Sequence, residues 1–247
     1  MLVGLSLVIA SGCICNNYLD RGIDQKMART RNRALVTGII GVRNALLFAA
    51  ICGTLGTVIL VLYTNLLTAG LAAFGWVAYV IIYGIAKRRS VHGTVIGSIS
   101  GAIPPVVGYL AASGRLDLGA LLLFIIMVSW QMPHFYAIAM YRRADYAAAN
   151  IPVLPLHSGI RATKIQILAY ILAFIVTSAA LTIFGYAGYI YLGVSLIIGG
   201  YWLWHGLQGY RPADEATDNR WARKMFGISL LVILLWAAAI AVDSFIH

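Results

Sequence analysis

Residues 1–33 read MLVGLSLVIASGCICNNYLDRGIDQKMARTRNR, an apolar run that gives way to mixed acids and cations. The segment from Met1 to Cys15 is almost wholly apolar and predicts a membrane-embedded helix. Asn16, Asp20 and Asp24 follow at intervals of four residues. At about 3.6 residues per turn, this spacing places the three polar side chains on one narrow helix face, over about 12 Å.

Two carboxylates and an amide at the edge of lipid are costly unless a partner compensates them. Hard oxygen ligands on one face suit a Mg²⁺ ion that also bridges phosphate oxygens, so we expect Mg²⁺ there. The cations that follow would neutralise the remaining phosphate charge. They are Arg21, Lys26, Arg29, Arg31 and Arg33. The alternative interpretation is a helix end with ordinary interfacial charges.

The composition is that of a polytopic membrane protein and excludes a soluble domain with one core. The chain has 247 residues, 61% of them hydrophobic, and a mean hydropathy of +0.86. Its apolar runs lack the alternation of barrel strands and are too long for them. We therefore predict an all-α helical bundle that forms one integral membrane domain over residues 1–247. The eight predicted spans are 1–19, 43–63, 66–86, 94–113, 118–140, 164–184, 187–207 and 225–245.

The net charge of +10 is distributed asymmetrically along these predicted spans. The loops near 20–42, 87–93, 141–163 and 208–224, with their helix edges, hold every Lys and Arg except Arg115. This positive-inside pattern makes the four loops cytoplasmic and explains the basic excess without a nucleic-acid partner. It also places Met1 outside, so we expect a further span to precede this sequence.

A second polar cluster covers residues 141–155, with Asp145 at a predicted helix end on the same side as Asp20 and Asp24. Alone, the segment is an ordinary charged loop. Facing the first cluster, it would complete a site for two Mg²⁺ ions and a diphosphate. Prolines 104, 105 and 133 lie inside predicted spans, where they predict either packing kinks or, as we favour, an interior pocket.

The chain resembles the UbiA superfamily of intramembrane prenyltransferases along nearly its whole length. The first signature of that superfamily, Asn-x3-Asp-x3-Asp, stands here as Asn16, Asp20 and Asp24. Two runs, Trp130-Gln131-Met132-Pro133-His134 and Ile151-Pro152-Val153-Leu154-Pro155, resemble its heme-modifying branch. Further matching segments are 26–33, 87–91, 101–109 and 145–155.

The resemblance implies an enzyme that transfers the farnesyl group of farnesyl diphosphate to a vinyl group of heme b, giving heme O. It implies Mg²⁺ ligands at Asn16, Asp20, Asp24 and Asp145, and diphosphate-binding cations at Lys26, Arg29, Arg33 and Arg142. It also implies a place in the cell inner membrane with the active site on the cytoplasmic side. A terminal oxidase or a heme A synthase would receive the product.

Two features depart from the superfamily pattern. Its second signature usually reads Asp-x3-Asp, but Ala149 stands four residues after Asp145, which leaves a second metal site poorly supported. The heme-modifying branch shares this departure, so the resemblance to that branch is unaffected. The superfamily also usually has nine spans, and eight are predicted here.

Several residues keep two interpretations. His134 either binds heme iron or is a core histidine. The basic groups at 87–89 and 142–143 either hold heme propionates or set topology. The cysteines, Cys13, Cys15 and Cys52, have no zinc-site spacing and are predicted to be packing residues.

Two other functions compete with the heme reaction. The first is prenylation of an aromatic quinone precursor, which the heme-branch runs oppose. The second is a cation-coupled transporter, whose acids would lie near the midplane. Here the acids adjoin a phosphate-sized basic cluster at one face, which favours an enzyme.

Overall fold

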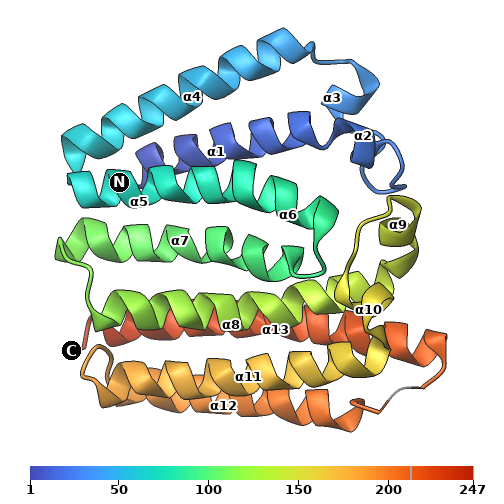
Figure 1. Cartoon of the computed structure of the whole chain (residues 1–247). Helices are drawn as coiled ribbons and strands as arrows, with labels where there is room; N and C mark the ends of the chain where they lie inside the picture. Colours follow the sequence, from blue (N-terminus) through green and yellow to red (C-terminus); the bar gives the residue numbers. More distant parts are fainter. Residues whose placement is uncertain (212, 247) are drawn as a thin grey trace. The chain divides into compact units, whose positions relative to one another are not determined.

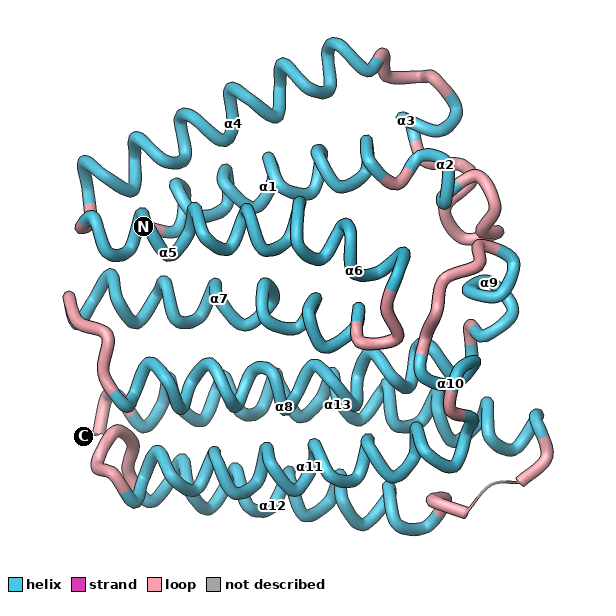
Figure 2. The backbone as a smooth tube through the Cα atoms, viewed as in Figure 1, coloured by secondary structure: helices cyan, strands magenta, loops and turns pink. Residues whose placement is uncertain are grey.

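The structure is a computed structural model that describes residues 1–211 and 213–246. Within these residues the regular elements are all helical, and no strand occurs (Figures 1 and 2). Eight described helices are long and apolar enough to cross a membrane, which confirms the all-α prediction. They are α1 (Leu2–Leu19), α4 (Val42–Tyr63), the continuous run Leu66–Arg89, α7 (Gly93–Ser113), α8 (Leu118–Tyr141), α11 (Gly159–Ile183), α12 (Tyr189–Gln208) and α13 (Glu215–Asp243). The chain is a multi-pass membrane protein.

Four short helices lie in the connections between these spans. Two of them, α2 (Arg21–Asp24) and α3 (Ala34–Thr37), follow α1. The other two, α9 (Arg143–Ala148) and α10 (Leu154–His157), lie between α8 and α11. The polar clusters found in the sequence therefore fall on short helices and helix ends.

The chain divides into two compact units. The first contains Met1–Ala120 together with Ala144–Val153, and the second contains Leu121–Arg143 together with Leu154–His247. Residues 144–148 of the short helix α9 thus belong with α1 to α7, although the chain reaches them only after α8. That residues 1–247 form one integral membrane domain stays a prediction.

In the first unit, α1 packs along α4, and α5 (Leu66–Val77) packs along α7 (Figure 1). Glycines permit the close approach of α1 and α4. A Cβ atom added at Gly56 would lie 2.6 Å from the carbonyl oxygen of Gly4, which a real side chain cannot do. Small residues that let backbones approach are the usual means of packing helices in lipid. This contact fixes α1, whose last turn carries Asn16.

The third span changes its helix type in the middle. After α5 it forms a π-helical segment, η1 (Ala78–Tyr83), and then resumes as α6 (Gly84–Arg89). The hydrogen bonds of a π-helix join residues five apart in the chain, so a π-helical turn contains about one residue more than an α-helical turn. Such turns are frequent at functional sites. In this protein the segment directly precedes α6, the short helix that carries Lys87.

In the second unit, α11, α12 and α13 pack in sequence order. The buried Asp243 at the end of α13 caps α12 from outside that helix. Its two carboxylate oxygens accept hydrogen bonds from the backbone N–H groups of Gly188 (2.5 Å) and Tyr191 (3.2 Å). These N–H groups have no partner within α12, so the carboxylate satisfies buried donors that would otherwise lack an acceptor.

The predicted span boundaries agree with the structure to within about three residues, except at two helix starts, where a helix begins in polar sequence. The last helix begins at Glu215 rather than at 225, because the Asp214 side chain caps it by accepting from the backbone N–H of Thr217 (3.0 Å). The sixth span, α11, begins at Gly159 rather than at 164, and Gly159 has a positive φ of 82°. Hydropathy finds only the apolar part of each helix.

Candidate functional site

The first polar cluster lies where α1 ends. Asp20 is the C-terminal cap of α1, and its backbone N–H bonds to the carbonyl of Asn16. Asn16 and Asp20 remain neighbours across this last turn, because Asn16 Nδ2 donates to Asp20 Oδ2 at 3.1 Å. The helix then breaks, and Asp24 lies on the separate turn α2. The prediction that all three share one face of a continuous helix was therefore wrong for Asp24.

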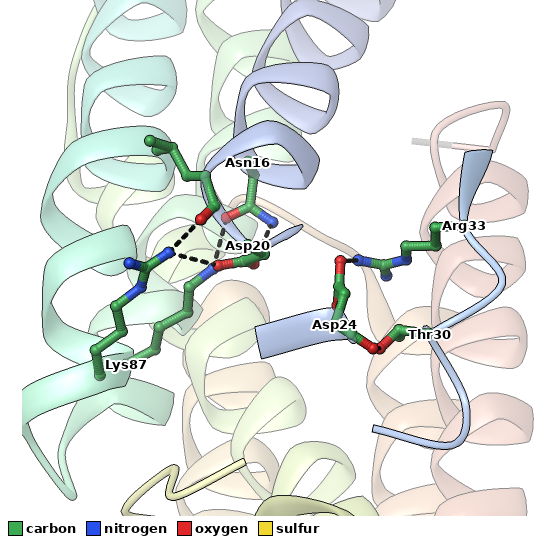
Figure 3. A network of polar contacts seen from close by, with 8 residues as sticks. Asn16, Asp20, Asp24, Thr30, Arg33 and Lys87 are labelled. Atoms are coloured by element: carbon green, nitrogen blue, oxygen red, sulfur yellow. Dashed lines mark hydrogen bonds and ion pairs between the residues drawn. The ribbon is translucent and has the colours of Figure 1, made fainter. Parts of the chain in front are cut away.

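A lysine from the third span completes this cluster. Lys87 Nζ donates to Asn16 Oδ1 at 2.6 Å and also to Asp20 Oδ2 (Figure 3). It also lies 4.8 Å from the centre of the Tyr83 ring. The side chains of Lys87 and Asp20 are only 9% and 11% exposed. Arg88 adds a second cation, with Nη2 3.3 Å from Asp20 Oδ1. The Asp20 carboxylate is therefore neutralised from two sides.

Asp24 pairs with a different cation. Its Oδ2 accepts from Arg33 Nη1 at 2.7 Å, and its backbone carbonyl accepts from the Thr30 hydroxyl at 3.1 Å. Figure 3 shows the two carboxylates directed to different cations, Asp20 to Lys87 and Asp24 to Arg33. Although Asp24 is buried, its contacts hold the loop between α2 and α3 in place.

The remaining predicted ligands are distributed over both units. Asp145 lies on α9 in the first unit, together with Asn16, Asp20 and Asp24. Tyr83 lies within electrostatic range of Asp20, Arg29 and Tyr146, which brings the residue after Asp145 near the first cluster. Lys26 and Arg29 are exposed on the loop that follows α2, and Arg142 belongs to the second unit.

The donor set suits a hard cation in part. No group of three or more His, Cys, Asp or Glu side chains is close enough to hold a metal, as far as residues 1–211 and 213–246 are concerned. Asn16 and Asp20 nevertheless present two oxygens to one cation, the Lys87 ammonium, which acts as a stand-in for a metal. Two protein oxygens fit an Mg²⁺ ion that takes its other ligands from water and from phosphate.

Sequence reasoning missed the contribution of Lys87. It grouped Lys87 with Arg88 and Arg89 as either propionate ligands or topology determinants, yet two of these three cations pair with Asp20. A signal was present: Tyr83 and Lys87 lie four residues apart, which places them on one helix face. Gly93 also permits the start of α7 to lie close to the backbone of Lys87, since a Cβ at Gly93 would lie 2.7 Å from Lys87 Cα.

His134 lies in the second unit, inside an aromatic cluster. Its ring stacks on Trp130 with centres 5.3 Å apart and tilts against Phe226 at 4.8 Å. Its Nδ1 lies 2.8 Å from the Ser229 hydroxyl. Pro133 and the pair Pro104 and Pro105 lie within helices α8 and α7, which run on through them. The interior pocket expected beside these prolines stays a prediction.

Sequence comparison places this chain among intramembrane prenyltransferases. The model of the UbiA prenyltransferase family matches residues 1–231. A protoheme IX farnesyltransferase of Protochlamydia amoebophila is 49% identical over 242 residues, which are 98% of this chain and 84% of the relative.

Solved structures share the fold. A UbiA homologue from Aeropyrum pernix, without ligand, aligns with a TM-score of 0.75 at 19% identity, over 98% of this chain and 87% of its own. A UbiA homologue from Archaeoglobus fulgidus, bound to GPP and Mg²⁺, aligns with a TM-score of 0.64 at 15% identity, over 98% and 89% of the two chains. Together with the family match, this shows that the chain belongs to the UbiA prenyltransferase family.

Proposed function

We propose that this chain transfers the farnesyl group of farnesyl diphosphate to a vinyl group of heme b. The observation that carries the proposal is the 49% identity over 98% of the chain with a protoheme IX farnesyltransferase. A likeness of this extent covers both polar clusters and the run around His134. Membership of a prenyltransferase family removes the main reason for considering a transporter.

The reaction needs no nucleophilic side chain. The bond between the first farnesyl carbon and its oxygen breaks, and the electron pair leaves with diphosphate. The terminal vinyl carbon of heme b attacks the resulting allylic centre. The positive charge passes to the inner vinyl carbon, where water adds and loses a proton, giving the hydroxyethylfarnesyl group of heme O. Farnesyl diphosphate, heme b and water thus account for every atom of heme O and diphosphate.

The first unit would bind the diphosphate. Mg²⁺ held by Asn16, Asp20, Asp24 and Asp145 would supply positive charge to the departing oxygens. The Lys87 ammonium donates hydrogen bonds to the Asn16 and Asp20 oxygens. It would neutralise the Asp20 carboxylate before the diphosphate binds and would donate to the diphosphate afterwards. Asp24 pairs with Arg33, so the Arg33 guanidinium lies beside a proposed metal ligand, where it would bind phosphate oxygens.

The exposed cations around this site would bind the outer phosphate oxygens. Lys26 and Arg29 lie on the loop that follows α2, and Arg142 is an exposed residue that precedes α9 in the chain. In the same proposal His134 binds the second substrate, heme b. The site would lie on the cytoplasmic side of the cell inner membrane, since the basic residues concentrate at this end of the spans. The product would pass to a terminal oxidase or a heme A synthase.

A reconstituted assay tests the proposal. Purified protein in lipid vesicles receives farnesyl diphosphate, Mg²⁺ and heme b, and the products are separated and weighed by mass spectrometry. We expect heme O, together with one diphosphate for each farnesyl group transferred, and no product when Mg²⁺ is chelated. A parallel reaction offers an aromatic quinone precursor in place of heme b. A prenylated aromatic product without heme O would overturn the heme assignment and leave the family membership intact.

A further inference from the structure

Two side chains of α8 form hydrogen bonds to one residue of α13. Trp130 Nε1 donates to the backbone carbonyl of Ser229 at 2.7 Å, and His134 Nδ1 lies 2.8 Å from the Ser229 hydroxyl oxygen. Trp130 and His134 are four residues apart and therefore lie on the same helix face. Ser229 is fully buried within the second unit.

The position of the Ser229 proton decides which nitrogen of His134 is protonated. The Ser229 hydroxyl lies 2.6 Å from the backbone carbonyl oxygen of Phe226. A carbonyl only accepts, so a contact this short requires the single hydroxyl proton of Ser229. Ser229 Oγ must then accept from His134, which places a proton on Nδ1. The neutral ring therefore carries its lone pair on Nε2.

That lone pair is available. Within residues 1–211 and 213–246, His134 Nε2 has no hydrogen-bond partner, and it is not among the buried polar atoms that lack one, so it reaches the accessible surface. The ring itself is held in place by Trp130 and Phe226. A neutral imidazole, fixed through one N–H and open at the other nitrogen, is the form in which histidine binds metals.

We infer that Ser229 is a positioning residue that holds His134 with its proton on Nδ1 and so presents Nε2 to the iron of heme b. The inference rests on the proposed function, since heme b is there the acceptor substrate. Ser229 itself touches no substrate. It acts by fixing the tautomer and the orientation of the His134 ring.

The first experiment titrates heme b into the purified protein without farnesyl diphosphate and follows ligation by optical and electron paramagnetic resonance spectra. We expect a histidine-ligated spectrum, which His134→Ala abolishes. Ser229→Ala should weaken heme affinity by about 10- to 100-fold, the usual effect of losing the hydrogen-bond partner of a ligand. The matched control is Ser178→Ala, which removes another fully buried hydroxyl from the same unit and should leave spectrum and affinity unchanged.

The second experiment leaves Ser229 intact. In His134→Gly, added imidazole should enter the vacated space and restore the ligated spectrum. Then 1-methylimidazole, which has no N–H to donate, should bind at least about tenfold more weakly than 4-methylimidazole, which has the same size and keeps one. Equal affinity for the two would overturn the role of Ser229, and an unchanged spectrum in His134→Ala would overturn iron ligation. Heme O formation by the unaltered protein is scored separately, so the reaction can stand if this inference fails.

Discussion

Each unit of the molecule contains a buried pair of lysine and aspartate, and the two pairs differ in how far the ammonium is satisfied. In the second unit, Lys164 Nζ donates to Asp218 Oδ1 (2.7 Å) and to the carbonyls of Gly209 (2.7 Å) and Arg211 (2.9 Å), and lies over the Trp221 ring. In the first, Lys87 donates to Asn16 and Asp20 alone among the described residues.

An ammonium has three N–H donors, so the difference indicates different roles. All three donors of Lys164 meet protein acceptors, two of them in the loop between α12 and α13, and the side chain is 1% exposed. This lysine is built to hold that loop. One N–H donor of Lys87 has no acceptor among the described residues, and the Lys87 side chain is more exposed than that of Lys164. Its carboxylate partner, Asp20, also pairs with Arg88. We interpret the Lys164–Asp218 pair as structural and the Lys87–Asp20 pair as part of a binding site.

The largest expected effect is on the stability of the second unit. Lys164→Met should lower the free energy of unfolding by about 3–5 kcal/mol, because it leaves the buried Asp218 carboxylate without its cation. Turnover per folded molecule should stay near normal. Thermal unfolding in detergent, followed by an assay of the folded fraction, measures both. A stable Lys164→Met protein that has lost its activity would break the distinction between the two pairs.

Replacing Asp20 should have a smaller energetic effect than replacing Lys164, but this effect should fall on catalysis. Asp20→Asn should reduce turnover at least about a hundredfold, the scale of losing one source of transition-state charge stabilisation. The protein should still fold, since the new amide oxygen can accept from Lys87. The matched control is Asp218→Asn, which removes the same charge from the other pair. Near-normal turnover in Asp20→Asn would remove Asp20 from the diphosphate site.

Replacing Lys87 should affect the binding of only one of the two substrates. Lys87→Met should weaken binding of farnesyl diphosphate by about ten- to a hundredfold, the value of one or two hydrogen bonds to a charged group. Heme b affinity should not change. Isothermal titration with a non-hydrolysable farnesyl diphosphate analogue, alongside heme titration, measures the two separately. If Lys87→Met binds the analogue as tightly as the unaltered protein, the ammonium serves only the fold.

The smallest effect is a pH dependence at the start of α13. Hydrogen bonds from the Thr217 hydroxyl and backbone N–H lower the pKa of Asp214 below its usual value of 3.8. A carboxyl whose pKa is lower in the folded state stabilises that state above its unfolded pKa. This stability is lost as the pH falls through the folded pKa, so the unfolding temperature should drop slightly below about pH 4. In Thr217→Val the drop should shrink, and an identical pH profile would contradict the assigned cause.

The spans and their order could be predicted from sequence because lipid imposes one requirement, a long apolar helix, on every crossing. The starts of α11 and α13 were misplaced because both helices begin in polar sequence, α11 at Gly159 and α13 after its N-cap Asp214. The division into two compact units was not foreseen. It depends on which helices pack together, and helices that are apolar on every side carry little record of their neighbours.

The candidate site was predictable in its composition and less so in its connections. Local spacing correctly paired Asn16 with Asp20. It failed for Asp24, because the chain turns after Asp20, and it gave no indication that Arg33 and Lys87 would be the partners. Lys87 is separated from Asn16 by 71 residues, and such a pairing is created by the packing of α1 against the third span.

The π-helical segment before Lys87 sets the rotational phase of the helix end that carries this lysine. One additional residue per turn rotates everything after it by about 100° relative to an uninterrupted α-helix. Removing a single residue from Ala78–Tyr83 would therefore turn the Lys87 side chain away from Asn16 and Asp20 while leaving the membrane belt almost as long. The orientation of the cation is thus encoded by a count of residues, and not by the identity of any one of them.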